Sequence, residues 1–212
     1  MSFEGVRAAL ALTPDLVARS VRSVTPDAVR RLAPGVRALC FDIDGTITDY
    51  HAPAIEPPDA EHLRSFREAG FRTFVISNCY GERVEQVHRL FDPLVTAVFT
   101  PVDCVDPAVP GDHASRHRKP APDMVLLAAA RAGGADDPVR PDEVLVVGDQ
   151  LLKDVAAARA AGARALLVPR LGQSDHLGVR LFQRPLEAVL RRLRGLPVRR
   201  PDWPDGLARP RS

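Results

Sequence analysis

Short apolar runs alternate with amphipathic helical segments between residues 36 and 168, and this alternation restricts the possible folds most strongly. The strand-like runs are Val36–Phe41, Phe71–Ser77, Thr96–Phe99, Glu143–Val147 and Ala165–Val168. Because nearly every residue in them is apolar, both faces of the strands must be covered. Helices between parallel strands provide that cover. The sequence therefore predicts an α/β fold, a three-layer Rossmann-like sandwich with a mainly parallel central sheet of about five strands.

Helix-start signals and apolar periodicity place the helices. We expect them over Pro57–Ala69, Glu82–Phe91, Pro122–Ala132, Leu151–Ala161 and Leu181–Leu193. Thr13-Pro14-Asp15 and Thr25-Pro26-Asp27 each combine an N-cap, a proline at the first helical position and an acidic first turn, which predicts two more short helices. We therefore divide the chain into an N-terminal helical segment (1–34), a domain over 35–196, and a Pro/Arg-rich tail (197–212) that we expect to be disordered.

The composition is that of an ordinary globular protein, with 45% hydrophobic and 26% charged residues. The longest uncharged apolar run, Met124–Ala130, is far shorter than the ~18 residues that indicate a membrane-spanning helix. No signal peptide is evident. The three cysteines, Cys40, Cys79 and Cys104, form no CxxC pair, which favours a reduced, cytoplasmic setting.

Polar clusters follow the predicted strands, where parallel sheets gather their chemistry. The first is Asp42-Ile43-Asp44-Gly45-Thr46. Two carboxylates so close together repel each other unless a cation or a shared proton relieves the repulsion. Divalent metals prefer such oxygen ligands, and Gly45 permits a sharp turn. This cluster alone leaves open a purely structural role or simple metal binding.

Three further clusters occur in order along the chain. Ser77-Asn78 suits phosphate oxygens, although such a pair is also common in turns. Lys119 and Lys153 are the only lysines of the chain. Lys119 precedes a predicted helix and can neutralise a phosphoryl group or simply lie on the surface. Gly148-Asp149 ends an apolar strand, and Asp154 can contribute a second carboxylate or interact with the helix dipole.

The order DxDGT, SN, KP and GDxxxxD between Val36 and Pro169 resembles the four-motif signature of phosphohydrolases of the haloacid dehalogenase (HAD) superfamily. The resemblance implies that Asp42 is the nucleophile, forming an aspartyl-phosphate, and that Asp44 is the general acid and base. It further implies Mg²⁺ bound by the Asp42 carboxylate, the Asp44 backbone carbonyl and Asp149. The implied phosphate-binding residues are Thr46, Ser77, Asn78 and Lys119, with Lys119 also catalytic, and the supporting residues are Gly45, Gly148 and Asp154.

Two intervals are too short to hold a cap domain: Asp42 to Ser77, and Ser77 to Lys119. The chain is therefore similar to the capless YqeG-type subgroup, which is related to phosphatidylglycerophosphate phosphatases. The run Gly148–Val155 and the late helix with Arg184 and Glu187 carry this resemblance. Gly45 departs from it, because the subgroup usually has Asn there, and so does the long loop Pro101–Arg118. The acid at Asp44 argues for phosphoryl chemistry rather than dehalogenation.

The substrate is left open between a lipid phosphate such as phosphatidylglycerophosphate and a soluble sugar phosphate or nucleotide. A non-catalytic phosphate-binding adaptor is a further alternative. Apolar residues beside arginines predict peripheral contact with the inner face of a membrane, although such stripes also occur in core packing. They lie at the N-terminus (Phe3, Val6, Leu10, Leu16, Val17) and in the late helix (Leu186, Val189, Leu190, Leu193).

From Arg170 onward the chain has ten arginines and four acidic residues, which suits an anionic partner or a solvated helix face and tail. Nucleic acid is not favoured, because Trp203 is the tail's only aromatic residue. Zinc binding by Cys104, His113 and His117 stays open, with irregular spacing against it. The sequence does not choose between Mg²⁺ and Mn²⁺, and it leaves the oligomeric state undetermined.

Overall fold

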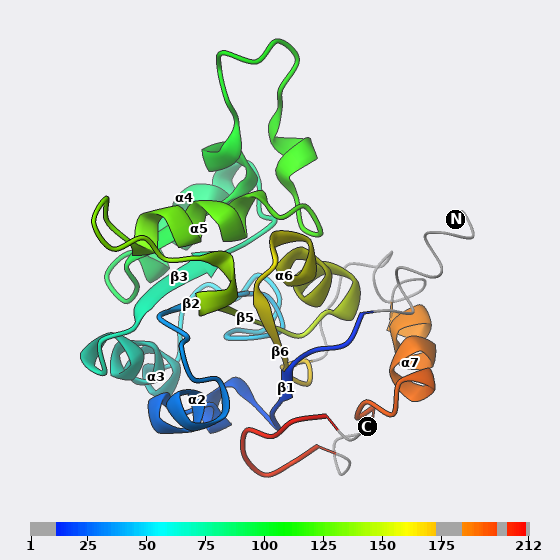
Figure 1. Ribbon diagram of the computed structural model, residues 1–212. Coiled ribbons are helices and arrows are strands. Elements are labelled where there is room, and N and C mark those ends of the chain that lie inside the picture. Colours follow the sequence, from blue (N-terminus) through cyan, green and yellow to red (C-terminus); the bar gives the residue numbers. More distant parts are fainter. Residues whose placement is uncertain (1–11, 173–183, 199–202, 211–212) are drawn as a thin grey trace.

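A parallel β-sheet forms the middle of the protein in a computed structural model that describes residues 12–172, 184–198 and 203–210 (Figure 1). Its order is β1-β6-β5-β2-β3-β4, and every neighbouring pair is parallel. The strands are β1 (Leu16–Val17), β2 (Ala38–Phe41), β3 (Arg72–Ile76), β4 (Ala97–Phe99), β5 (Val144–Gly148) and β6 (Arg164–Leu167). The five predicted strands are confirmed, and β1 is a sixth.

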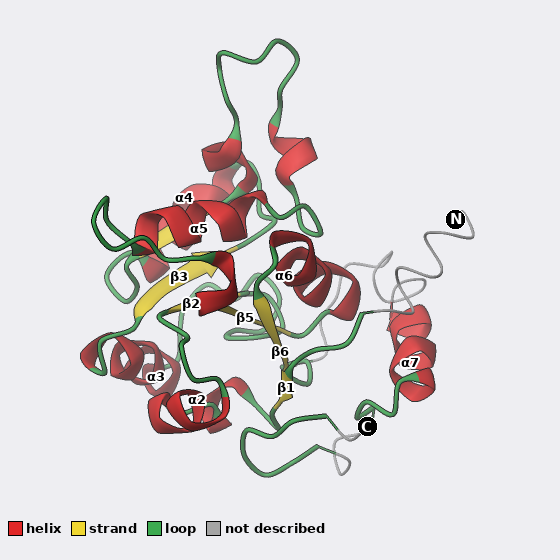
Figure 2. Ribbon diagram, in the orientation of Figure 1, coloured by secondary structure: helices red, strands yellow, loops and turns green. Residues whose placement is uncertain are grey.

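Two hydrophobic cores lie on opposite faces of the sheet, because successive strand side chains alternate in direction. Leu39 and Phe41 belong to one core, and Ala38 and Cys40 to the other. The first core is covered by α2 (Pro26–Leu32), α3 (Pro57–Glu68) and α4 (Glu82–Phe91), and the second by α5 (Asp123–Ala132), α6 (Ala156–Ala161) and α7 (Arg184–Leu193). The predicted three-layer α/β fold is confirmed (Figure 2).

The helix predicted after Thr13-Pro14-Asp15 is wrong, because this segment leads into β1. The Asp15 backbone N–H donates to the Ala165 carbonyl at 2.8 Å, and the Asp15 carboxylate accepts the Ala165 N–H at 2.7 Å. Asp15 therefore satisfies the edge of β6 instead of a helix N-terminus. Thr25 does cap α2, by accepting a hydrogen bond from Ala28 N–H at 3.2 Å.

The expected disorder of 197–212 is also wrong for the part that the structure describes, 203–210. Trp203 is only 3% exposed and Leu207 is buried. Val17 and Ala208 exchange two backbone hydrogen bonds, of 2.8 and 2.9 Å, along the outer edge of β1. A strand edge needs partners for its N–H and C=O groups, and this segment supplies them. Residues 199–202 and 211–212 lie outside the described residues.

The predicted helix over Leu151–Ala161 begins as a π-helical turn, Leu151–Val155, and continues as α6. Two 3₁₀ turns, Pro101–Cys104 and Ala114–His117, form the base of a protruding loop at the top of Figure 1. Within 12–172, which the structure describes without a gap, no separate cap is evident. None of the described helices is long and apolar enough to cross a membrane.

Candidate functional site

Three neighbouring central strands deliver the motif residues to one edge of the sheet. Phe41 pairs with Val75 of β3 and Val147 of β5, so β2, β3 and β5 end at the same level. Asp42 follows β2, and its N–H donates to the Val147 carbonyl at 2.9 Å. Ser77 follows β3 and Asp149 follows β5. The fold thus brings together motifs that are far apart in the sequence.

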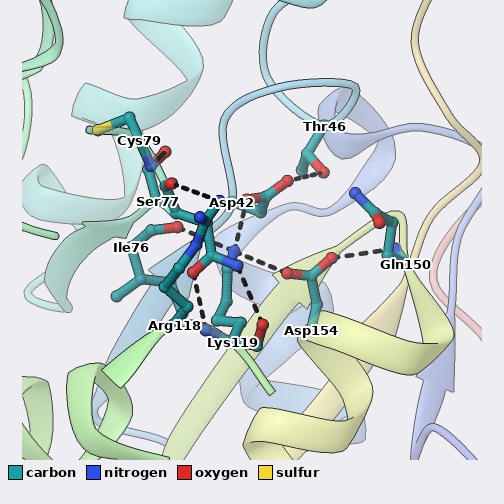
Figure 3. Close-up of polar contacts among 10 residues, drawn as sticks. Asp42, Thr46, Ile76, Ser77, Cys79, Arg118, Lys119, Gln150 and Asp154 are labelled. Carbon is teal, nitrogen blue, oxygen red and sulfur yellow. Dashed lines mark hydrogen bonds and ion pairs between the residues drawn. The ribbon is translucent and has the colours of Figure 1, made fainter. Parts of the chain in front are cut away.

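Lys119 lies at the centre of this edge (Figure 3). Its Nζ is 2.5 Å from Asp42 Oδ1 and 2.7 Å from Asp154 Oδ1, and it donates to the Ile76 carbonyl at 3.0 Å. The side chain is only 2% exposed. Burial alone would lower the pKa of this ammonium, but the carboxylates of Asp154 and Asp42 raise it above its ordinary value. Lys119 is therefore a buried, charged group.

Asn78 holds the segment that carries Lys119. Its side-chain amide donates to the Lys119 carbonyl at 3.0 Å, and its oxygen accepts the Lys119 N–H at 2.7 Å. Both ends of the Asn78 amide thus bond to the Lys119 backbone. The amide predicted to bind phosphate holds the lysine in place in this structure.

Three buried carboxylates converge beside the lysine. Asp42, Asp149 and Asp154 each offer an oxygen, and these oxygens lie within 4.8 Å of one another. Burial, then the charges of Asp154 and Asp149, raise the pKa of Asp42 to about 7 against the opposing effect of Lys119. Three carboxylates facing one ammonium leave an excess of negative charge, and a divalent cation with oxygen ligands would offset it. This donor set fits the predicted metal.

The Asp44 carboxylate is outside this cluster. It accepts a hydrogen bond from His51 N–H at 2.8 Å and lies 3.3 Å from Arg83 Nη2. Arg83, on the first turn of α4, also donates to the Ala52 carbonyl at 3.0 Å. Arg83 was not among the site residues predicted from the sequence. A basic residue in the first turn of a helix interacts unfavourably with the helix dipole. The position of Arg83 in the first turn of α4 is therefore a sequence signal that could have indicated a role outside helix stability.

Asp42, Asp44 and Lys119 line a cavity of about 680 Å³. Its wall includes Tyr80 and Arg118, whose guanidinium lies 5.6 Å from the centre of the Tyr80 ring. Ser77 also lines it, and the Ser77 hydroxyl accepts Cys79 N–H at 3.2 Å. The cavity gives a substrate access to the edge of the sheet.

Two glycines allow the chain to pass close to the carboxylates. Gly45 has φ +89°, and an added Cβ would lie 3.1 Å from Asp149 Oδ2. An added Cβ at Gly148 would lie 2.3 Å from Asp154 Cγ. Beside Gly45, the Thr46 hydroxyl donates to Asp42 Oδ2 at 3.3 Å. Gly45, Thr46 and Gly148 therefore all lie against the carboxylate cluster.

The loop histidines have partners other than a metal. Each ring nitrogen of His117 lies 2.9 Å from a carboxylate oxygen, Nδ1 from Asp123 and Nε2 from Asp112. His113 Nδ1 lies 2.8 Å from the Ser115 hydroxyl. Asp123 and Asp112 raise the pKa of His117. Within the described part of the chain, the only convergent group of three metal-ligand side chains is the aspartate cluster.

Comparisons with known proteins find hydrolase and phosphatase relatives. A family model described as HAD-hydrolase-like matches residues 116–196. The probable phosphatase YqeG of Bacillus subtilis is 25% identical over 174 residues, which cover 82% of this chain and 86% of that protein.

Two solved structures are also similar in fold. A HAD phosphatase from Thermococcus onnurineus is 23% identical with a TM-score of 0.43, over 58% of this chain and 50% of that one. A putative phosphoglycolate phosphatase from Lactobacillus delbrueckii is 22% identical with a TM-score of 0.41, over 53% of this chain and 40% of that one. The matched region therefore spans half or less of the length of each of these two proteins.

The aspartate cluster, the family match over residues 116–196 and the 25% identity over most of the chain agree with one another. In these respects the chain is similar to HAD-family phosphatases.

Proposed function

We propose that the chain hydrolyses phosphomonoesters through an aspartyl-phosphate on Asp42, with Asp44 as the general acid and base. The observation that carries the proposal is the pairing of Lys119 with Asp42 at 2.5 Å, beside a buried three-carboxylate cluster that faces a cavity. A buried carboxylate held next to a cation has the arrangement of an activated nucleophile.

Asp42 would attack the phosphorus, and the bond from phosphorus to the leaving oxygen would break. The Lys119 ammonium favours the ionised form of Asp42, because it opposes the rise in pKa that burial and the neighbouring carboxylates cause, and it would balance the charge that gathers on the phosphoryl oxygens. The Thr46 hydroxyl, 3.3 Å from Asp42 Oδ2, and the Ser77 hydroxyl can reach the same oxygens. Bound Mg²⁺, held by Asp42, Asp149 and the Asp44 backbone carbonyl, would supply further positive charge.

Asp44 is suited to proton transfer because its carboxylate lines the cavity outside the aspartate cluster. It would give its proton to the leaving oxygen and then take a proton from the water that attacks the aspartyl-phosphate. That water would release inorganic phosphate and regenerate the Asp42 carboxylate. Arg83, 3.3 Å away, and the His51 N–H hold Asp44 in this position.

The cavity favours a substrate that carries a second anionic group. Arg118 and Lys153 line it in addition to Lys119, and among the described residues neither is ion-paired with a carboxylate. Phosphatidylglycerophosphate carries a phosphodiester as well as its terminal phosphomonoester, so these two cations can recognise it. A soluble phosphomonoester is the second candidate, since about 680 Å³ is enough to enclose a small ligand.

The proposed contact with a membrane surface is based on the exposed side chains of α7. Leu186, Val189 and Leu193 are exposed on this helix, as are Arg192 and Arg194. Exposed apolar residues beside arginines suit the surface of an anionic bilayer. The predicted N-terminal stripe gives no support, because Leu16 and Val17 are buried in β1, while Phe3, Val6 and Leu10 lie outside the described residues.

The test is phosphate release by the purified protein with Mg²⁺. Phosphatidylglycerophosphate in anionic vesicles is compared with soluble phosphomonoesters, and Asp42→Asn serves as the inactive control. The triple variant Leu186→Gln, Val189→Gln, Leu193→Gln should lose activity on vesicles but keep activity on a soluble substrate. Val109→Gln, at another exposed apolar site, should change neither. An active Asp42→Asn would refute the mechanism, whereas activity on soluble compounds alone would refute only the lipid assignment.

A further inference from the structure

Two buried charged side chains connect α7 to the turn that carries Asp149. Arg191 Nη2 donates to the backbone carbonyl of Asp149 at 2.7 Å. One turn earlier on the helix, Glu187 Oε1 accepts the Leu152 N–H at 3.0 Å. Glu187 is 2% exposed and Arg191 is 8% exposed. The last helix of the described fold therefore holds the backbone on both sides of Gln150 and Leu151.

Glu187 and Asp154 each satisfy a backbone donor of this turn. The first N–H groups of a helix have no partner within the helix, and Glu187 satisfies one of them at the start of the π-helical turn Leu151–Val155. Asp154 Oδ2 satisfies another by accepting Gln150 N–H at 3.0 Å. The same turn positions Asp149 and Asp154, so its backbone geometry determines where both carboxylates lie.

Arg191 is itself packed against the C-terminal segment. Arg191 Nη2 lies 3.7 Å from Glu187 Oε2, and its guanidinium lies 5.8 Å from the centre of the buried Trp203 ring. Leu190 and Leu196 are buried beside it in the same hydrophobic core as Trp203. A buried ion pair is costly unless its polar groups find partners. The bonds of Glu187 and Arg191 to the turn supply such partners, and together with the packing of Leu190 they give α7 a defined position against the turn.

We infer that Arg191 and Glu187 are positioning residues for the Asp149 carboxylate, and that α7 thereby sets the affinity of the site for a divalent cation. Neither residue belongs to the cluster of candidate ligands. Residues that orient a metal ligand typically change metal affinity by roughly 10- to 100-fold when they are removed. This inference rests on the metal site of the proposed function.

The direct test is binding of Mn²⁺, as a spectroscopic substitute for Mg²⁺, followed by electron paramagnetic resonance of the purified full-length protein without substrate. We expect Arg191→Met to weaken Mn²⁺ binding roughly 10-fold or more. Arg191→Lys, which keeps a donor and a charge, should give an intermediate affinity. Arg192→Met is the matched control, since Arg192 is exposed on the same helix, and it should bind as the wild type does.

A second readout separates positioning from general destabilisation. If Arg191 acts through the metal site, raising the Mg²⁺ concentration should restore most of the phosphatase activity of Arg191→Met. Should that variant fail to fold, Arg191→Lys compared with Arg192→Lys decides the question. Wild-type Mn²⁺ affinity in the Arg191 variants would overturn the inference while leaving the proposed function intact. Unchanged Mn²⁺ binding by Asp149→Asn would instead show that the proposed metal site is wrong.

Discussion

Lys119 Nζ lies 2.5 Å from Asp42 and 2.7 Å from Asp154, so a single buried ammonium joins three of the four sequence motifs. The two carboxylates are 77 and 35 residues away from it along the chain. Because the ammonium holds both of them, the proposed nucleophile Asp42 and the turn after β5 depend on the same cation. The first prediction follows from this dependence.

Replacing Lys119 with Met should destabilise the protein and abolish phosphate release. It would leave two buried carboxylates without their cation, and removal of one partner from such a pair typically costs about 3–5 kcal/mol of unfolding free energy. Urea denaturation measures the loss. Lys153→Met is the matched control, because Lys153 lines the same cavity without a carboxylate partner in the described structure, and it should leave the unfolding free energy nearly unchanged. Equal stability of the two variants would refute the central role of Lys119.

The metal-free protein should lose stability as the pH rises. The pKa of Asp42 in the folded protein is about 7, above its ordinary value of 3.8, so the folded state binds this proton more tightly than the unfolded state. The resulting stabilisation is complete below pH 3.8 and is lost as the pH rises through about 7. Thermal unfolding in EDTA between pH 5 and 8.5 should show this fall for the wild type. The Asp42→Asn variant should show a flatter profile, and the exposed-site control Asp136→Asn should follow the wild type.

Addition of Mg²⁺ should restore stability at pH 8, because a bound cation offsets the repulsion within the aspartate cluster. The measurement is the melting temperature with and without Mg²⁺. A similar increase for Asp149→Asn would contradict the assignment of the metal to this cluster.

Gly148→Ala should damage both stability and activity. The added Cβ would lie 2.3 Å from Cγ of Asp154, which holds Lys119. Forcing an extra carbon into a packed site typically costs about 1–3 kcal/mol. Gly134→Ala is the control, since an added Cβ there meets nothing within 4 Å. Chemical denaturation and phosphate release together test the prediction. Wild-type behaviour of Gly148→Ala would show that the space between residue 148 and the Asp154 side chain can accommodate a Cβ.

Trp203→Ala should destabilise the protein by about 3–5 kcal/mol, the usual cost of truncating a large buried aromatic residue. Trp203 is 3% exposed and lies under the Arg191 guanidinium. Leu193→Ala, at a site that is 66% exposed, should have little effect. The urea midpoints of the two variants give the comparison. If both variants match the wild type, the packing of the C-terminal segment makes no contribution to stability.

Elements with local signals could be predicted without the structure. Five strands were predictable from apolar runs such as Phe71–Ser77, because a strand covered on both faces needs apolar side chains in succession. The convergence of Asp42, Ser77 and Asp149 was predictable as well, since parallel strands end at one edge of the sheet. The closely spaced carboxylates of Asp42 and Asp44 likewise predicted a divalent-cation site, because their repulsion needs a cation or a shared proton.

Features that depend on partners distant in the sequence could not be predicted and became visible in the folded protein. Thr13-Pro14-Asp15 and Thr25-Pro26-Asp27 carry the same local helix signal, but the edge of β6 at Ala165 makes the first lead into a strand. Arg83 faces Asp44, and Arg191 bonds to Asp149 across 42 residues. Such contacts leave no periodicity in the sequence, because they arise when elements far apart in the chain pack against one another.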